Sequence, residues 1–164
     1  MIKRLTRLAL LTAVALAVYI IEAQIPALVP ISGIKLGLAN AVTLFALLHF
    51  GRRDALIVLV ARIILGSLVT GGFSALLYSL SGGLAAYFVS ALIYKKLGRD
   101  RAFVTGAVSA VTHGAAQLCV AALITETTAL WFWLAPMTAA GLITGAFTGF
   151  CAGFVSKRLE NAVR

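Results

Sequence analysis

The chain has few charged residues for its length, and very few acidic ones. Only 12% of its 164 residues are charged, and Asp and Glu together number 5. A soluble domain is typically about one quarter charged, because its surface must remain hydrated. This shortage of polar surface nearly excludes a soluble enzyme.

The motifs of common catalytic and metal chemistries are also missing. The two cysteines, Cys119 and Cys151, have no second Cys or His at metal-ligand spacing, so neither a zinc site nor a disulfide framework is expected. The sequence has no Walker-type phosphate loop and no paired carboxylates for acid/base chemistry. We therefore expect no metal, no cofactor, no catalytic residue and no ATPase activity in this chain.

Most of the chain is apolar. Hydrophobic residues make up 62% of it, and the mean hydropathy is +1.04. A membrane helix needs roughly 20 apolar residues. Charges, prolines and glycine pairs divide the chain into six candidate helices at 8–25, 36–50, 54–70, 73–94, 102–124 and 130–155. We predict an all-α membrane protein in which residues 1–164 form a single domain of six transmembrane helices.

The net charge of +9 indicates orientation in a membrane rather than a nucleic-acid partner. The 14 Lys and Arg residues form short clusters between the apolar runs. If the N-terminus is cytoplasmic, every one of them except Lys35 and Arg62 falls on an inside segment, as the positive-inside rule requires. The sequence therefore predicts an N-in, C-in topology, with Trp131, Phe132 and Trp133 at the outer interface.

Small residues recur every four positions on several candidate helices. The last candidate helix has a line of four glycines, Gly141, Gly145, Gly149 and Gly153. Such a smooth face favours close contact with another helix backbone, here within the bundle. The first candidate helix has a similar line of alanines, Ala9, Ala13 and Ala17, for which packing within the bundle and docking of a partner are equally possible.

Several polar residues occur where the helices should cross the membrane. A charge at mid-bilayer costs at least about 2.5 kcal/mol, so Arg62, eight residues beyond Asp54, must face a partner or a water-filled cavity. Ser109, His113 and Gln117 share one face of the fifth candidate helix. That polar stripe is as compatible with helix packing as with ligand contact.

The connection after the first helix is broken but apolar. Two prolines and two glycines interrupt residues 24–40, and such segments occur at membrane depth where they line a cavity. Glu22 and Lys35 flank this connection, and they could form a salt bridge with each other, or Glu22 could pair with Arg62.

Together these residues predict a polar pocket that opens toward the outside. Its expected members are Glu22, Lys35, Asn40, Arg62, His113 and Gln117. Two fixed cations against one carboxylate favour a ligand with an anionic or strongly hydrogen-bonding head.

Four motifs resemble those of a bacterial membrane family. They are GIKLGLANAVTL at 33–44, RIILG at 62–66, SLSGG at 79–83 and HGAAQ at 113–117. In this order they resemble the Gx transporter family, also labelled heptaprenyl diphosphate synthase component I. That family is similar to the substrate-binding S components of energy-coupling factor (ECF) importers.

The resemblance implies a six-helix S-component fold in the bacterial cytoplasmic membrane. It also implies a ligand site near the outer face, gated by the loop after the first helix, for a small anionic or vitamin-like molecule. The implied partners are a membrane coupling subunit, which would dock on Ala9, Ala13 and Ala17, and two ATPase subunits. The aspartate-rich motifs of prenyl synthases are absent, and no vitamin-specific motif is present.

Two other functions remain open from the sequence. The chain could be a non-transporting membrane subunit that anchors a quinone-related, isoprenoid or electron-transfer assembly, with its polar residues holding helices together. It could also be an accessory to prenyl diphosphate synthesis. Co-purifying partners, a retained ligand and prenyl-transfer assays would discriminate among these hypotheses.

Overall fold

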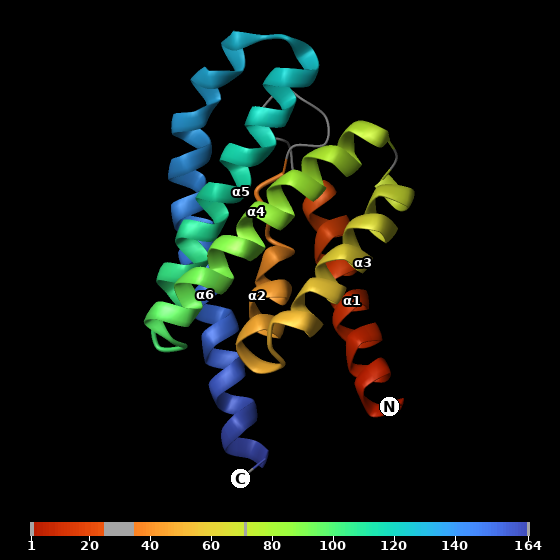
Figure 1. Ribbon diagram of the computed structural model, residues 1–164, viewed down its shortest axis with the longest axis vertical. Helices are drawn as coiled ribbons and strands as arrows, with labels where there is room; N and C mark the ends of the chain where they lie inside the picture. The colour runs from red at the N-terminus through yellow and green to blue at the C-terminus, as the bar shows by residue number, and fades with distance from the viewer. Residues whose placement is uncertain (1, 25–34, 71, 164) are drawn as a thin grey trace.

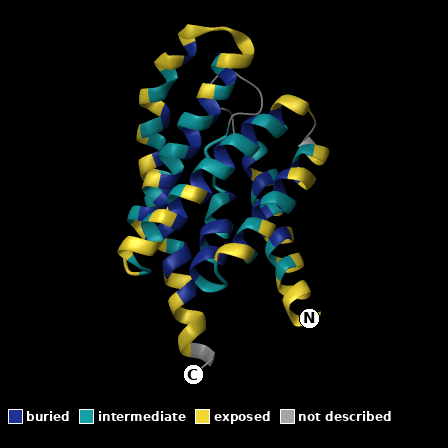
Figure 2. Ribbon diagram, in the orientation of Figure 1, coloured by how far each residue is buried: buried dark blue, intermediate teal, exposed yellow. Residues whose placement is uncertain are grey.

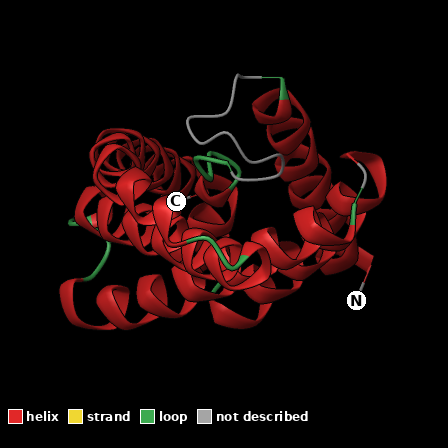
Figure 3. Cartoon of the chain, turned by 90° about the horizontal axis from the view of Figure 1, so that it is seen from above, coloured by secondary structure: helices red, strands yellow, loops and turns green. Residues whose placement is uncertain are grey.

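The structure, a computed structural model, describes residues 2–24, 35–70 and 72–163. Within these ranges the regular elements are all helices (Figure 1). In chain order they are α1 (Ile2–Ala23), α2 (Asn40–His49), α3 (Arg52–Thr70), α4 (Phe73–Leu97), α5 (Ala102–Thr125), the 3-10 helix η1 (Thr128–Trp133) and α6 (Leu134–Val163). Seen from above, the helices form a bundle with no sheet among the described residues (Figure 3). The predicted all-α class is therefore correct.

Four segments of the described chain are long and apolar enough to cross a membrane. They are α1, α4, α5 and the continuous stretch Thr128–Asn161, which includes η1 and most of α6. α3 has 19 residues, but its sequence contains four charges, and α2 has only 10 residues. Four such helices are typical of a multi-pass membrane protein.

α2 is shorter than the predicted range of 36–50. The helix begins only at Asn40, because Gly37 has a positive φ of 84° and starts a turn that its carbonyl closes by accepting from the Asn40 N–H at 2.9 Å. Ten residues rise about 15 Å, which is half of a bilayer core. α2 therefore resembles the half-helices that begin inside membrane proteins, with its N-terminus inside the bundle.

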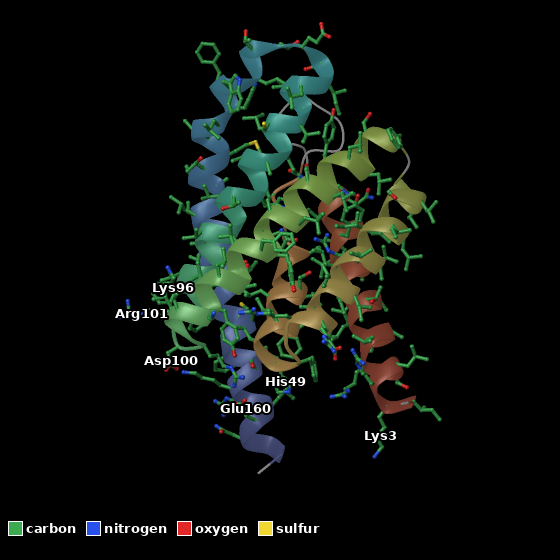
Figure 4. All side chains as sticks on the ribbon, in the orientation of Figure 1. Lys3, His49, Lys96, Asp100, Arg101 and Glu160 are labelled. Carbon is green, nitrogen blue, oxygen red and sulfur yellow. The ribbon has the colours of Figure 1, made fainter. Side chains whose placement is uncertain are left out.

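Both chain termini lie at one end of the bundle (Figure 1). Charged side chains from several elements gather at the same end, among them Lys3, Lys96 and Arg101 (Figure 4). The turn between α5 and α6, which carries the exposed Trp131 and Phe132, lies at the opposite end. This arrangement agrees with the predicted separation of the basic clusters from the aromatic residues.

α5 and α6 make the closest helix pair in the bundle. A Cβ atom added to Gly145 would lie 2.5 Å from the Gly106 carbonyl oxygen, and one added to Gly149 would lie 2.4 Å from the Ala102 carbonyl oxygen. The two backbones can approach this far only because these positions have no side chain. The predicted packing of the glycine line on another helix is confirmed, and the partner is α5.

The line of alanines on α1 points away from the bundle. Ala9, Ala13 and Ala17 are all exposed, whereas Thr12, Ala15 and Tyr19 on the opposite face are buried. Figure 2 shows the same division along the other helices, with buried residues toward the inside of the bundle and exposed residues outside. Within the described chain, the alanine face is not used for packing.

Candidate ligand-binding site

The six residues predicted to line a pocket come together in the structure. Glu22, Arg62, His113 and Gln117 are 4%, 2%, 3% and 1% exposed, and Lys35 and Asn40 are partly buried. They come from α1, α3, α5, α2 and the short segment 35–39 that leads into α2. Residues far apart in the sequence therefore form one buried polar group.

A chain of hydrogen bonds links three of the helices. The Arg62 guanidinium donates through Nη2 to Oδ1 of Asn40, and Nδ2 of Asn40 lies 3.0 Å from Nδ1 of His113. Because the Asn40 oxygen faces a group that only donates, its amide nitrogen faces the imidazole. The His113 Nδ1 atom thus accepts in this arrangement. The buried Arg62 of α3 is therefore linked through the neutral Asn40 amide of α2 to the His113 imidazole of α5.

Two side chains hold the segment that precedes α2. Oε1 of Gln117 accepts from the backbone N–H of Lys35 at 3.2 Å, and Oε1 of Glu22 accepts from the backbone N–H of Gly37 at 2.5 Å. Backbone groups inside a membrane protein must find partners, since lipid offers none. Glu22 and Gln117 therefore position the 35–39 segment over the buried group.

The Lys35 ammonium forms no ion pair with any carboxylate in the part of the chain that the structure describes. Its Nζ lies 3.3 Å from the centre of the Tyr19 ring, and it is buried with no hydrogen-bond partner among the described residues. A cation over an aromatic face is stabilised by the ring quadrupole, but none of its three N–H donors is satisfied in this way. Of the two ion pairs left open for Glu22, neither the one with Lys35 nor the one with Arg62 is formed among the described residues, and the Glu22 carboxylate instead accepts from the Gly37 N–H.

Glycines make room for the His113 ring on two sides. A Cβ on Gly82 of α4 would lie 2.8 Å from its Nδ1 and Cε1 atoms, and a Cβ on Gly37 would lie 2.9 Å from its Cδ2 atom. Gly66 of α3 similarly admits the Tyr19 ring, which a Cβ there would approach within 2.7 Å. The ring positions in this group therefore depend on glycine.

A small cavity lies next to Asn40, between α2, α4 and α5. Its polar lining includes Thr43, Ser90 and Ser109, and it has room for about one water molecule. The Thr43 hydroxyl oxygen is buried and has no hydrogen-bond partner among the described residues. Ser109, the first member of the predicted stripe, thus lines this cavity and not the group around Arg62.

The charges of the buried group do not balance. Arg62 and Lys35 are cations, and Glu22 is the one carboxylate among its members. The N-terminus of α2 begins at Asn40 and adds the positive end of a helix dipole. The site is therefore electropositive in a region of low dielectric.

Comparison with known proteins gives one match. Residues 11–155 match the protein family described as heptaprenyl diphosphate synthase component I. The chain belongs to this family. Searches of curated proteins and of solved structures give no significant match.

In this member of the heptaprenyl diphosphate synthase component I family, no metal site is formed by the described residues. No three side chains among His, Cys, Asp and Glu come together there in a way that could hold a metal ion. The acidic residues at the basic end, Asp54, Asp100 and Glu160, each pair with a basic side chain.

Three residues of the site were not predicted from the sequence of this family member. Tyr19 lies under Lys35, Ser79 lies with its hydroxyl 3.5 Å from the Tyr19 hydroxyl, and Gly82 accommodates His113. Tyr19 is three residues from Glu22 on one face of α1, so helical spacing could have indicated it. Ser79 and Gly82 lie within the motif at 79–83, but their small size gave no sign of a packing role.

Proposed function

We propose that this protein is the substrate-binding membrane subunit, or S component, of an ECF-type importer. It captures a small anionic or cofactor-like molecule from the face of the membrane opposite its termini. Its membrane is the bacterial cytoplasmic membrane, and its N- and C-termini are cytoplasmic. It performs no catalytic step itself and depends on a coupling subunit and two ATPase subunits.

The observation that carries this proposal is the unbalanced charge of the buried group. A purely structural polar cluster would pair its cations, because an unpaired charge in a membrane protein is costly. Here the buried Nζ of Lys35 has no hydrogen-bond partner among the described residues, and Arg62 is held by the neutral amide of Asn40. An anionic ligand would supply the missing negative charge and accept from these donors.

The exposed face of α1 supports the proposed partnership. Ala9, Ala13 and Ala17 form a smooth surface that no other described helix covers. Small residues at this spacing allow another membrane helix to approach closely. A coupling subunit would dock there and leave the ligand site on the inner face of α1 unobstructed.

The ligand can be tested by native mass spectrometry of protein purified in a mild detergent. We expect a retained small molecule on the wild type and its loss in Lys35→Met, since Met preserves the stem length but removes the charge. Arg53→Gln is the matched control, because Arg53 is an exposed cation at the basic end of α3. Equal retention by Lys35→Met and the control would contradict the site assignment.

The partner can be tested by co-purification from membranes. Ala13→Leu adds bulk to the exposed face of α1, and we expect it to abolish recovery of a coupling subunit and its ATPases. Ala139→Leu, at an exposed alanine of α6, should leave recovery unchanged. If both variants retain the same partners, α1 is not the docking helix.

A second candidate function follows from the family description. The chain could be a non-transporting membrane subunit that anchors an isoprenoid- or quinone-related assembly, since the family is described as a synthase component. This candidate predicts co-purification with a non-ATPase partner and an empty ligand site. Prenyl transfer by the isolated chain with allylic diphosphate, isopentenyl diphosphate and magnesium would instead indicate an enzyme.

A further inference from the structure

A groove lies at the basic end of the bundle, far from the buried polar group. It has a volume of about 220 Å³ and lies between the beginning of α5 and the C-terminal half of α6. The groove exists because the two helices touch at Gly153, where a Cβ would come within 2.9 Å of the Ala102 side chain. Larger side chains on either side of this contact form the walls.

One wall of the groove is aromatic. Phe103, Phe150 and Phe154 line it and are 51%, 62% and 50% exposed. The rings of Phe150 and Phe154 are stacked, with centroids 6.2 Å apart. This wall offers an apolar surface of the kind that packs against an acyl chain.

The rim of the groove carries two ion pairs. Lys157 Nζ lies 2.6 Å from Asp100 Oδ1, and Arg99 pairs with Glu160. The hydrogen bond from Lys157 holds the pKa of the Asp100 carboxyl below its usual value, so this acid stays charged and paired. Both acidic residues near the groove are therefore neutralised by local partners.

One further cation beside the groove has no such partner. Arg158 is exposed, its guanidinium lies 5.2 Å from the centre of the Phe154 ring, and it forms no ion pair with any described residue. The aromatic wall therefore has an unpaired positive charge next to it.

We propose that this groove binds one anionic phospholipid of the leaflet at the basic end. The lipid phosphate lies against Arg158, and an acyl chain lies along the aromatic wall. A zwitterionic lipid fits less well, because its ammonium group would meet the same cation. Arg99, which lines the groove, also donates to the Leu48 carbonyl of α2 at 2.7 Å, so the groove lies beside the contact between α2, α5 and α6.

The test compares phosphatidylglycerol with phosphatidylcholine of identical acyl chains on the purified full chain. Native mass spectrometry measures the adduct ratio, and thermal unfolding measures the accompanying stabilisation. We expect Arg158→Gln to lower the preference for phosphatidylglycerol about fivefold, since one basic residue near a lipid surface has roughly that effect. Lys3→Gln is the matched control, because Lys3 lies at the same end on α1 (Figure 4).

Two further arms separate a lipid from a free anion. Phe154→Ser should weaken binding of both lipids, since it removes part of the wall, while the deacylated headgroup glycerophosphoglycerol should neither bind nor stabilise. Stabilisation by the headgroup alone would overturn the proposal in favour of a simple anion site. Equal binding of the two lipids, or an equal effect of Lys3→Gln and Arg158→Gln, would also overturn it.

Discussion

Replacement of Gly82 by alanine is expected to disrupt the buried polar group. The new Cβ would lie 2.8 Å from Nδ1 and Cε1 of His113 and 2.8 Å from Cγ of Gln117. Real Cβ atoms essentially never come this close, so these side chains must move. The ring cannot simply retreat, because the backbone of Gly37 lies against its other side.

The magnitude follows from two opposing effects. Overpacking a well-packed interior costs about 1 to 3 kcal/mol. Exchange of Gly for Ala inside a helix contributes up to about 1 kcal/mol in the favourable direction. The control is Gly141→Ala in α6, where the nearest atom would be at 3.4 Å, an ordinary contact. Because helix propensity is common to both variants, Gly82→Ala should be less stable than Gly141→Ala by about 1 to 3 kcal/mol.

The assay is unfolding by SDS titration in mixed micelles, followed by far-UV circular dichroism. A second readout is the imidazole nitrogen resonance of His113, which should shift in Gly82→Ala because its contact with Asn40 is disturbed. If Gly82→Ala is as stable as Gly141→Ala and the resonance is unchanged, His113 is not held between these glycines.

Three other substitutions test the packing and the site. Gly145→Ala should cost about 1 to 3 kcal/mol in the same unfolding assay, because its Cβ would meet the Gly106 carbonyl oxygen at 2.5 Å and part the helices. Asn40→Leu leaves the buried Arg62 guanidinium without its acceptor and should cost at least about 2 kcal/mol, whereas a smaller loss would mean that water replaces the amide. Tyr19→Leu removes the ring beneath the buried ammonium and should cost about 1 to 2 kcal/mol, measured against wild type by SDS titration; unchanged stability would refute the cation–π contact.

Much of the helix arrangement could be predicted from the sequence, because charged residues and glycines mark where apolar membrane helices begin and end. Charges and glycines fixed the limits of α3, α4 and α5 to within three residues of those observed. The glycine line of α6 predicted a close contact with another helix, because a face of four glycines lets two backbones approach, and the structure shows that this helix is α5. α2 was predicted too long, because an apolar sequence does not reveal that Gly37 adopts a positive φ and delays the helix.

The members of the buried group could also be predicted, but not their contacts. Polar residues are rare in an apolar chain, so Arg62 and His113 were conspicuous, and lipid forces such residues inward. Which of them pair depends on the path of the segment 35–39. In that segment the backbone N–H of Gly37 donates to the Glu22 carboxylate, and the Lys35 ammonium lies over the Tyr19 ring.

A pair of charge changes tests directly whether the electropositive buried group holds an anion. Glu22→Gln keeps the oxygen that accepts from Gly37 but removes the negative charge, whereas Lys35→Met removes a positive charge. The measurement is the fraction of each purified variant that retains a small molecule in native mass spectra. If the buried group holds an anion, retention should be equal or greater in Glu22→Gln and lost in Lys35→Met. Equal loss in both variants, or no retained molecule in either variant or the wild type, would contradict it.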